Sequence, residues 1–359
     1  MMLDDRVSEI CIVLLTGIGD VVHGLPVANA IKDDDRARRI TWVAEPAPAE
    51  VLREHPSVDR VIVFRKKDGL RGVARLRDDF REYRFDLTLN MQRHFKGVFP
   101  TLFSRAPTRV GLDPAKVREG VWRFSNHHIE PGPWAHTQDM LLRFLDPLGI
   151  QRPDPLEWRI TFSEAEKSRQ TTFFADLPDG PVVGLVLGSN VARKDWPSER
   201  YAELAEAIAV RHEATVLLVG GPAERERAAA DLIIGHTKHR PISTLADDVR
   251  RMMWTVGGCD LLVSPDSGPL HLAHALGVPV VGLYGHTNPA RVGPYSRYRD
   301  LVVDAYHDPG ETPDPTVPGS RDGRMDQIAV SDVLERVERA FDLYVPAGGR
   351  RSNSTENEP

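Results

Sequence analysis

The chain has 359 residues, a formal net charge of −6 at pH 7 and two cysteines. This length exceeds what one hydrophobic core usually organises, so we expect two domains, and the acidic balance argues against binding to nucleic acid. Cys11 and Cys259 lie in or beside apolar runs, which favours buried thiols over a disulfide framework, and no apolar run reaches membrane-spanning length, so we expect a cytoplasmic protein.

The first half of the chain alternates strands and helices. A continuous apolar run at 10–15 predicts a buried strand, which enters a loop with Gly17 and Gly19. A helix should follow, and Pro26 either begins that helix or kinks it. Further strands are predicted at 40–45, 58–64 and 85–90, with helices at 47–54 and 70–83. This order is typical of a parallel sheet with crossover helices.

Basic residues gather directly after the strand at 85–90. Arg93, His94 and Lys96 follow it, and Arg105, Arg109 and Arg118 extend the positive zone. Two interpretations remain open here, a solvated loop and a site for an anionic acceptor.

The second half begins after a proline-rich join and a polar helix at 163–175. We expect a first domain at 1–165, a linker at 166–181 and a second domain at 182–326, which opens with a buried strand. An amphipathic helix at 327–345 follows. The composition of residues 346–359 predicts a disordered tail.

The most informative stretch is 261–284, which predicts a buried strand, a sharp turn, a helix and a second buried strand. Asp266 or Ser267 can cap the helix, Gly268 allows a ligand close to the backbone, and Pro269 suits a first helical turn. Free N–H groups and the helix dipole would then form an anion site at the carboxyl edge of the sheet. An ordinary capped helix is the alternative.

The spacing Asp-Ser-Gly-x-x-His, from Asp266 to His271, resembles the signature of glycosyltransferase family 9, the heptosyltransferases and their relatives. Two further motifs match that family, Gly-Asp-Val at 19–21 and Lys-x-Trp-Pro at 194–197. The resemblance implies an α/β protein with the GT-B fold, in which two Rossmann-like domains with parallel sheets face a central cleft. It also implies that the C-terminal helix crosses back to the first domain.

The resemblance implies transfer of a sugar with inversion, heptose from ADP-heptose, onto a lipopolysaccharide-core or related glycolipid. Asp20 would be the catalytic base, with a helix cap as its alternative role. The implied donor-binding residues are Lys194, Glu224, Asp266, Ser267, Gly268 and His271, with Glu226 as the alternative to Glu224. The implied acceptor contacts are Arg93, His94, Lys96 and His136.

The expected partners are a nucleotide-sugar donor, an anionic glycolipid acceptor and, transiently, the inner membrane surface, but no nucleic acid. Two other functions stay open, a GT-B sugar-nucleotide epimerase and a non-catalytic nucleotide-sugar-binding protein. Asp266, His271 and His274 raise the question of a metal. The two histidines are three residues apart rather than four, and no second carboxylate is nearby in the sequence, so we expect no metal and no cofactor.

Overall fold

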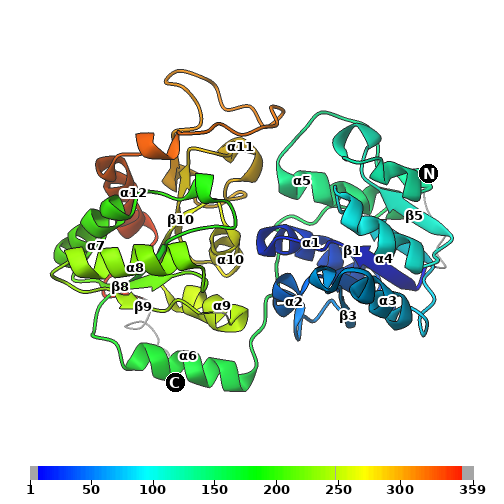
Figure 1. Cartoon of the computed structure of the whole chain (residues 1–359), viewed down its shortest axis with the longest axis horizontal. Coiled ribbons are helices and arrows are strands. Elements are labelled where there is room, and N and C mark those ends of the chain that lie inside the picture. Colours follow the sequence, from blue (N-terminus) through cyan, green and yellow to red (C-terminus); the bar gives the residue numbers. More distant parts are fainter. Residues whose placement is uncertain (1–6, 247, 350–359) are drawn as a thin grey trace. The chain divides into compact units, whose positions relative to one another are not determined.

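The structure is a computed structural model that describes residues 7–246 and 248–349. The chain divides between Thr161 and Phe162 into two compact units, each built on a six-stranded parallel sheet with helices packed around it (Figure 1). Within the described residues, no helix has the length and apolar character needed to cross a membrane.

The sheet of unit 1 has the strand order β3-β2-β1-β4-β5-β6. Its direction of winding reverses between β1 and β4, and open α/β sheets bind ligands outside the carboxyl ends of the strands at such a point. The strands are β1 (Glu9–Val13), β2 (Arg39–Ala44), β3 (Arg60–Val63), β4 (Leu87–Asn90), β5 (Thr108–Gly111) and β6 (His127–His128).

The connections of unit 1 bring each helix back across the sheet. The helices are α1 (Ile18–Asp34), α2 (Pro46–Leu52), α3 (Gly69–Asp79), α4 (Val98–Phe103) and α5 (Thr137–Leu142). Pro26 lies inside α1, so it does not begin this helix. A core formed by Cys11, Val13, Leu76, Phe80 and their neighbours fills the space between the sheet and α3.

Unit 2 repeats this plan with the strand order β12-β11-β10-β7-β8-β9, and its switch point lies between β7 and β10. Its strands are β7 (Val182–Val186), β8 (Thr215–Val219), β9 (Ile242–Ser243), β10 (Leu261–Pro265), β11 (Val280–Tyr284) and β12 (Val302–Asp304). Its helices are α6 (Glu164–Ala175), α7 (Ser198–His212), α8 (Glu224–His236), α9 (Val249–Gly258), α10 (Gly268–Ala275), α11 (Pro289–Val292) and α12 (Val330–Leu343).

Helix α6 occupies much of the segment expected as a linker. Ser163 and Glu166 form a capping box at its start, and Glu166 Oε2 also accepts a hydrogen bond from buried Arg250 Nη2 at 2.6 Å. This contact joins α6 to α9 within unit 2. Helix α12 packs against α7, β11 and β12 of the same unit. Its expected return to the first domain stays a prediction, and residues 350–359 of the expected tail lie outside the described residues.

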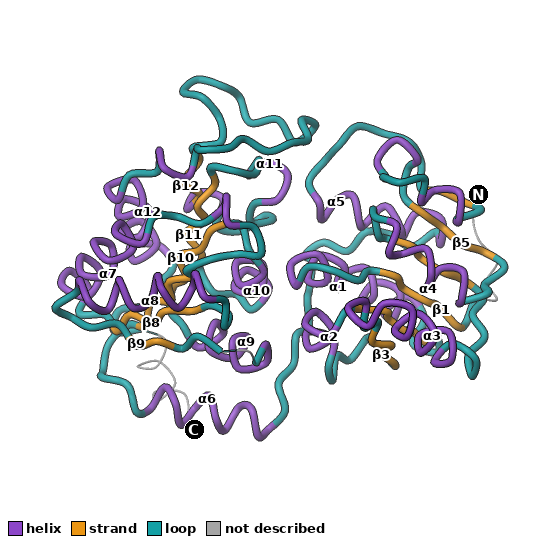
Figure 2. Tube along the Cα trace, in the orientation of Figure 1, coloured by secondary structure: helices purple, strands orange, loops and turns teal. Residues whose placement is uncertain are grey.

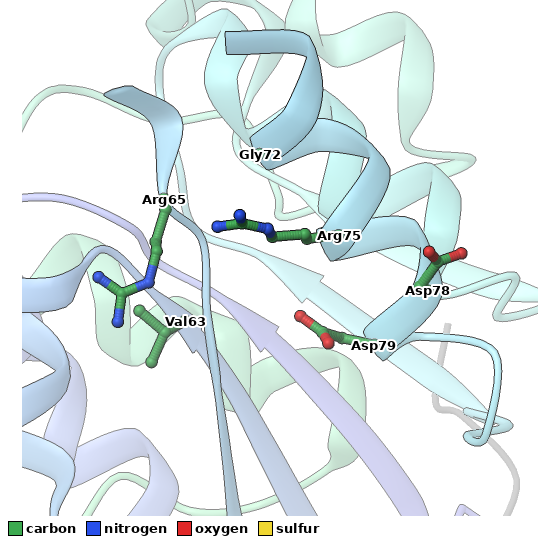
Figure 3. A pocket seen from close by; sticks show the side chains of 6 residues that line it. All are labelled: Val63, Arg65, Gly72, Arg75, Asp78 and Asp79. Atoms are coloured by element: carbon green, nitrogen blue, oxygen red, sulfur yellow. The ribbon is translucent and has the colours of Figure 1, made fainter. Parts of the chain in front are cut away.

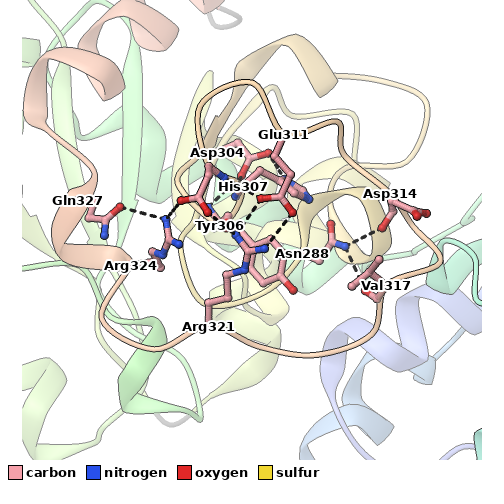
Figure 4. A network of polar contacts seen from close by, with 11 residues as sticks. Asn288, Asp304, Tyr306, His307, Glu311, Asp314, Val317, Arg321, Arg324 and Gln327 are labelled. Atoms are coloured by element: carbon pink, nitrogen blue, oxygen red, sulfur yellow. Dashed lines mark hydrogen bonds and ion pairs between the residues drawn. The ribbon is translucent and has the colours of Figure 1, made fainter.

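A long irregular segment separates β12 from α12, and Figure 2 shows it largely as loop. Arg321 pairs with Glu311 at 2.9 Å and Arg324 with Asp308 at 2.7 Å, and these contacts hold the segment together (Figure 4). Asn288, which follows β11, donates to the carbonyl of Asp314 at 2.9 Å. The segment is therefore attached to the loop at the carboxyl end of β11.

Candidate active site

The centre of the site in unit 2 is the carboxylate of Asp266, directly after β10. Lys194 Nζ lies 2.6 Å from Asp266 Oδ2, and the Thr287 hydroxyl donates to the same oxygen at 2.8 Å. His271 Nε2 lies 3.3 Å from Asp266 Oδ1. Three loops, after β7, β10 and β11, therefore meet at one carboxylate. The structure brings three of the predicted donor residues, Lys194, Asp266 and His271, into contact.

Asp266 is held in its ionised form by these partners. Burial alone would favour the neutral acid, but the His271 hydrogen bond and the charge of Lys194 outweigh it, and the pKa of Asp266 lies well below its usual range. An ammonium group has three N–H donors, and the hydrogen bonds of Lys194 Nζ in the described chain go to Asp266 Oδ2 and, at 3.4 Å, to the Asp266 carbonyl. A further N–H of Lys194 is thus available for an anionic ligand.

The start of α10 differs from the expectation in one respect. We expected Asp266 or Ser267 to cap this helix, but its N-terminus has no side-chain cap. The Ser267 hydroxyl lies 2.9 Å from that of Ser264, and the Asp266 carboxylate is engaged as described above. Both side chains that could cap the helix therefore have other hydrogen-bond partners. The first N–H groups of α10, beside Gly268, keep the anion-binding character of a helix N-terminus.

The two carboxylates considered for binding the nucleotide ribose lie at the start of α8, after β8. Glu224 is exposed in the first turn of this helix, whereas Glu226 is buried and accepts the Gly221 N–H at 2.7 Å. Glu226 therefore supports the glycine loop, and Glu224 is the carboxylate that remains accessible. Arg225, between them, has its Nε 2.9 Å from Asp195 Oδ2, in the loop that carries Lys194.

In unit 1, Asp20 lies at the carboxyl end of β1. It is the third residue of α1, which begins at Ile18 with Gly17 as N-cap and without a side-chain cap. Asp20 is therefore not the N-cap of this helix, and its assignment as the base stays a prediction. The Asp20 side chain is exposed, and a Cβ added to Gly17 would lie 2.5 Å from its Oδ2. Gly17, at a φ of 83°, leaves room for this carboxylate.

Lys96 brings together the ends of three strands beside Asp20. It donates to the Thr16 hydroxyl after β1 and lies 3.3 Å from Glu45 Oε1 after β2, while Lys96 itself follows β4. Burial lowers the pKa of Lys96, and the charges of Glu45 and Asp20 oppose that shift. At the carboxyl edge of this sheet the ammonium group of Lys96 therefore interacts electrostatically with two carboxylates, Glu45 and Asp20.

The other expected acceptor residues occupy two further places. Arg93 is half-buried. Its guanidinium carbon lies 4.7 Å from the centre of the Trp134 ring, and its Nε donates a hydrogen bond to the Lys116 carbonyl. His94, next to it, is exposed, and partial burial lowers its pKa together with nearby cations. His136 is buried and accepts the Gln138 N–H at the start of α5. His136 thus has a structural role as the N-cap of α5.

The Nε2 atom of His274 forms a hydrogen bond with the carbonyl of Tyr295. Among the described residues, no group of three or more His, Cys, Asp or Glu side chains is arranged to hold a metal ion.

Comparisons with known proteins decide the family. A sequence model of a protein family, described as Glycosyltransferase family 9 (heptosyltransferase), matches residues 73–311. The chain belongs to glycosyltransferase family 9. The lipopolysaccharide core heptosyltransferase OpsX of Haemophilus influenzae is 31% identical over 305 residues, which cover 84% of this chain and 85% of that protein. The sequence resemblance is therefore confirmed.

Solved structures show the fold of this family 9 glycosyltransferase. The family 9 glycosyl transferase from Veillonella parvula superposes with a TM-score of 0.80 at 23% identity, over 94% of this chain and 98% of that one. The E. coli heptosyltransferase WaaC with ADP gives a TM-score of 0.73 at 22% identity, over 92% and 99% of the two chains. The GT-B fold expected from the sequence is confirmed.

Three residues of the site in this family 9 enzyme were not predicted from the sequence and were identified only in the structure. Thr287 and Glu45 each follow a strand, at the sheet edge where ligands bind, and this position was the one available signal for them. Asp195 stands inside the Lys-x-Trp-Pro motif at its variable position. Its pairing with Arg225 had no signal in the sequence, because the two residues lie in different loops.

Proposed function

We propose that this enzyme transfers heptose from ADP-heptose, with inversion, onto a lipopolysaccharide-core or related glycolipid acceptor. Membership of family 9 and the similarity to a lipopolysaccharide core heptosyltransferase support this proposal. One structural observation carries it: the Lys194–Asp266 ion pair adjoins the uncapped start of α10. An ammonium group and free helix N–H groups together suit a diphosphate.

The donor would bind at the carboxyl edge of the unit 2 sheet. In this proposal Lys194 and the amides around Ser267 and Gly268 hold the diphosphate, while Glu224 accepts hydrogen bonds from the ribose hydroxyls. Asp266 acts through Lys194, whose ammonium group it orients, and His271 holds the other oxygen of that carboxylate. The same contacts would stabilise ADP as negative charge develops on the leaving diphosphate.

The acceptor would bind to unit 1. We assign Asp20 as the general base, which takes the proton of the acceptor hydroxyl as its oxygen attacks the anomeric carbon of heptose. The bond from that carbon to the ADP oxygen breaks on the opposite face, and inversion follows. Arg93 and Lys96 supply positive charge for an anionic acceptor, the exposed His94 beside them offers a hydrogen-bonding group, and His136 contributes as the N-cap of α5.

The proposal also assigns a location. An enzyme acting on a glycolipid precursor would work in the cytoplasm, at the inner face of the cytoplasmic membrane, in transient contact with it.

The test is product analysis with purified enzyme, ADP-heptose and a lipopolysaccharide-core acceptor. We expect ADP release and a heptosylated acceptor with inverted anomeric configuration, detected by mass spectrometry and NMR, and no sugar product when acceptor is omitted. Rearranged sugar without acceptor would instead identify an epimerase. ADP-heptose binding without any turnover would identify a binding protein.

A further inference from the structure

A strongly basic loop follows β3 at the carboxyl edge of the unit 1 sheet. We call residues 65–71 the basic loop. All seven are exposed, and they include four cations, Arg65, Lys66, Lys67 and Arg71, with Asp68 as the single carboxylate. The chain as a whole carries a charge of −6, so this concentration of positive charge is local. The arrangement favours an anionic partner.

The basic loop also presents an apolar side chain to solvent. Leu70 is 88% exposed, more than any other large hydrophobic side chain in the described chain. It opens α3 after Gly69, and the helix buries Gly72 and Leu76 instead. Leu70 lies six residues before Leu76, which at 3.6 residues per turn places it well away from the buried face. The leucine is therefore free to contact a partner.

The basic loop adjoins the proposed acceptor side of the active site. Burial lowers the pKa of Lys96, and the positive charge of Lys66 lowers it further. The negative charge of Asp20 raises the same pKa, so Lys66 and Asp20 both lie within electrostatic range of Lys96. Phe95, next to Lys96 in the chain, is itself 43% exposed. Positive charge and exposed apolar groups thus occur at the edge where the glycolipid acceptor is proposed to bind.

A pocket of about 320 Å³ lies between the basic loop and α3 (Figure 3). It is lined by Val63, Arg65, Gly72, Arg75, Asp78 and Asp79. Figure 3 shows the Arg75 side chain extended toward Arg65, with the two carboxylates nearer the end of α3. Arg75 Nη1 also pairs with Asp68 at 2.9 Å, which ties the helix to the loop. The pocket therefore presents its guanidinium groups on the side of the basic loop.

We propose that the basic loop docks this enzyme on the surface of an anionic phospholipid bilayer, with Leu70 inserted between the lipids. Cations near an anionic leaflet and an apolar side chain below the headgroups are the two contributions that hold peripheral proteins on membranes. The proposal rests on the proposed function in one respect, because a glycolipid acceptor resides in such a bilayer. It gives the transient membrane contact a defined surface.

Flotation with lipid vesicles tests the docking surface without any catalytic step. We expect the full chain to bind vesicles of phosphatidylcholine mixed with phosphatidylglycerol, not vesicles of phosphatidylcholine alone, and to dissociate as salt rises. Lys66→Gln with Lys67→Gln should weaken binding about thirtyfold, since two surface cations are lost. Leu70→Ser should weaken it about tenfold.

Matched variants in unit 2 control for charge and exposed apolar area. Lys238→Gln with Arg240→Gln removes the same charge from exposed positions, and Val210→Ser alters a valine that is 58% exposed. Both should bind vesicles like the unchanged protein. Equal binding by the basic-loop variants and the controls would overturn the proposal. So would binding only to vesicles that contain the acceptor glycolipid, since the partner would then be the acceptor headgroup.

A second readout separates this proposal from the proposed function. The basic-loop variants should lose transfer to acceptor embedded in anionic vesicles but keep transfer to a lipid-free core oligosaccharide. Loss of both reactions would place the loop in acceptor binding and overturn membrane docking. If no heptose is transferred under any condition while vesicle binding depends on the basic loop, the proposed function fails and the docking surface stands.

Discussion

Lys194 and Asp266 come from loops 72 residues apart and form an ion pair of 2.6 Å in which both side chains are largely buried, 19% and 9% exposed. Asp266 is also bonded by Thr287 and His271, so the lysine meets a fixed carboxylate. A restrained ammonium group loses little conformational entropy when a ligand binds, and preorganised charge of this kind favours tight binding.

Lys194→Ala should weaken both ADP binding and turnover. The loss of one charged contact to phosphate costs about 1.5–3 kcal/mol, which corresponds to a decrease in affinity of roughly ten- to a hundredfold. Calorimetry with ADP measures it. Lys167→Ala, at an exposed lysine of α6, is the control and should leave affinity unchanged. An unaltered affinity in Lys194→Ala would remove this residue from the donor site.

Asp20→Asn should abolish transfer while donor binding persists. A positioned general base typically contributes about 10²–10⁴ in rate, and the amide cannot accept the proton. Asp20 is exposed and asparagine has nearly the same shape as aspartate, so the substitution should have little effect on folding. Steady-state rates at saturating acceptor, with Asp231→Asn on α8 as the control, provide the measurement. Near-normal turnover would exclude Asp20 as the base.

Thr287→Val should destabilise unit 2, whereas Thr287→Ser should not. The valine removes the hydroxyl that donates to Asp266 Oδ2, and a buried charged acceptor that loses a partner costs about 1–3 kcal/mol. Serine keeps the donor. Urea denaturation of both variants compares the free energies of unfolding. Destabilisation by serine but not by valine would point to packing of the Thr287 methyl group, which valine retains, instead of the hydrogen bond.

In Arg225→Met, the free energy of unfolding should decrease by more as pH rises than it does in the unchanged protein. Burial raises the pKa of Asp195, and the charge of Arg225 opposes the shift. Between the ordinary and the raised pKa the folded state holds a proton that the unfolded chain has released, so stability falls as pH rises through that window. Without Arg225 the raised pKa moves further up, and the window widens.

The expected cost of Arg225→Met is about 1 kcal/mol at neutral pH, as for a partly exposed ion pair. It should shrink as pH falls below the ordinary pKa of an aspartate, about 3.9, where Asp195 becomes protonated in both states. Urea denaturation across this range measures it. Arg227→Met, one position beyond Glu226 on the same helix, is the control, and Asp195→Asn should remove the pH dependence of the Arg225→Met effect. A cost that does not vary with pH would show that Arg225 acts through packing.

Local patterns in the sequence were sufficient for the parallel-sheet class, and the resemblance to family 9 supplied the GT-B fold. Continuous apolar runs ending in glycine or polar turns predicted the central strands, because a strand buried on both faces needs apolar residues throughout. Short strands such as β6 and β9, with two residues each, lack such a run and were not predicted. The donor motif from Asp266 to His271 was recognisable because strand, turn and helix follow one another directly in the chain.

The tertiary structure decided which groups those motif residues bind. Capping propensity assigned Asp266 or Ser267 to the start of α10, but Lys194, Thr287 and Ser264 offered these side chains other partners. Glu45 and Lys96 meet for the same reason as Lys194 and Asp266. In a parallel sheet the carboxyl ends of neighbouring strands lie at one edge, whatever length of chain separates them, and local sequence carries no record of that proximity.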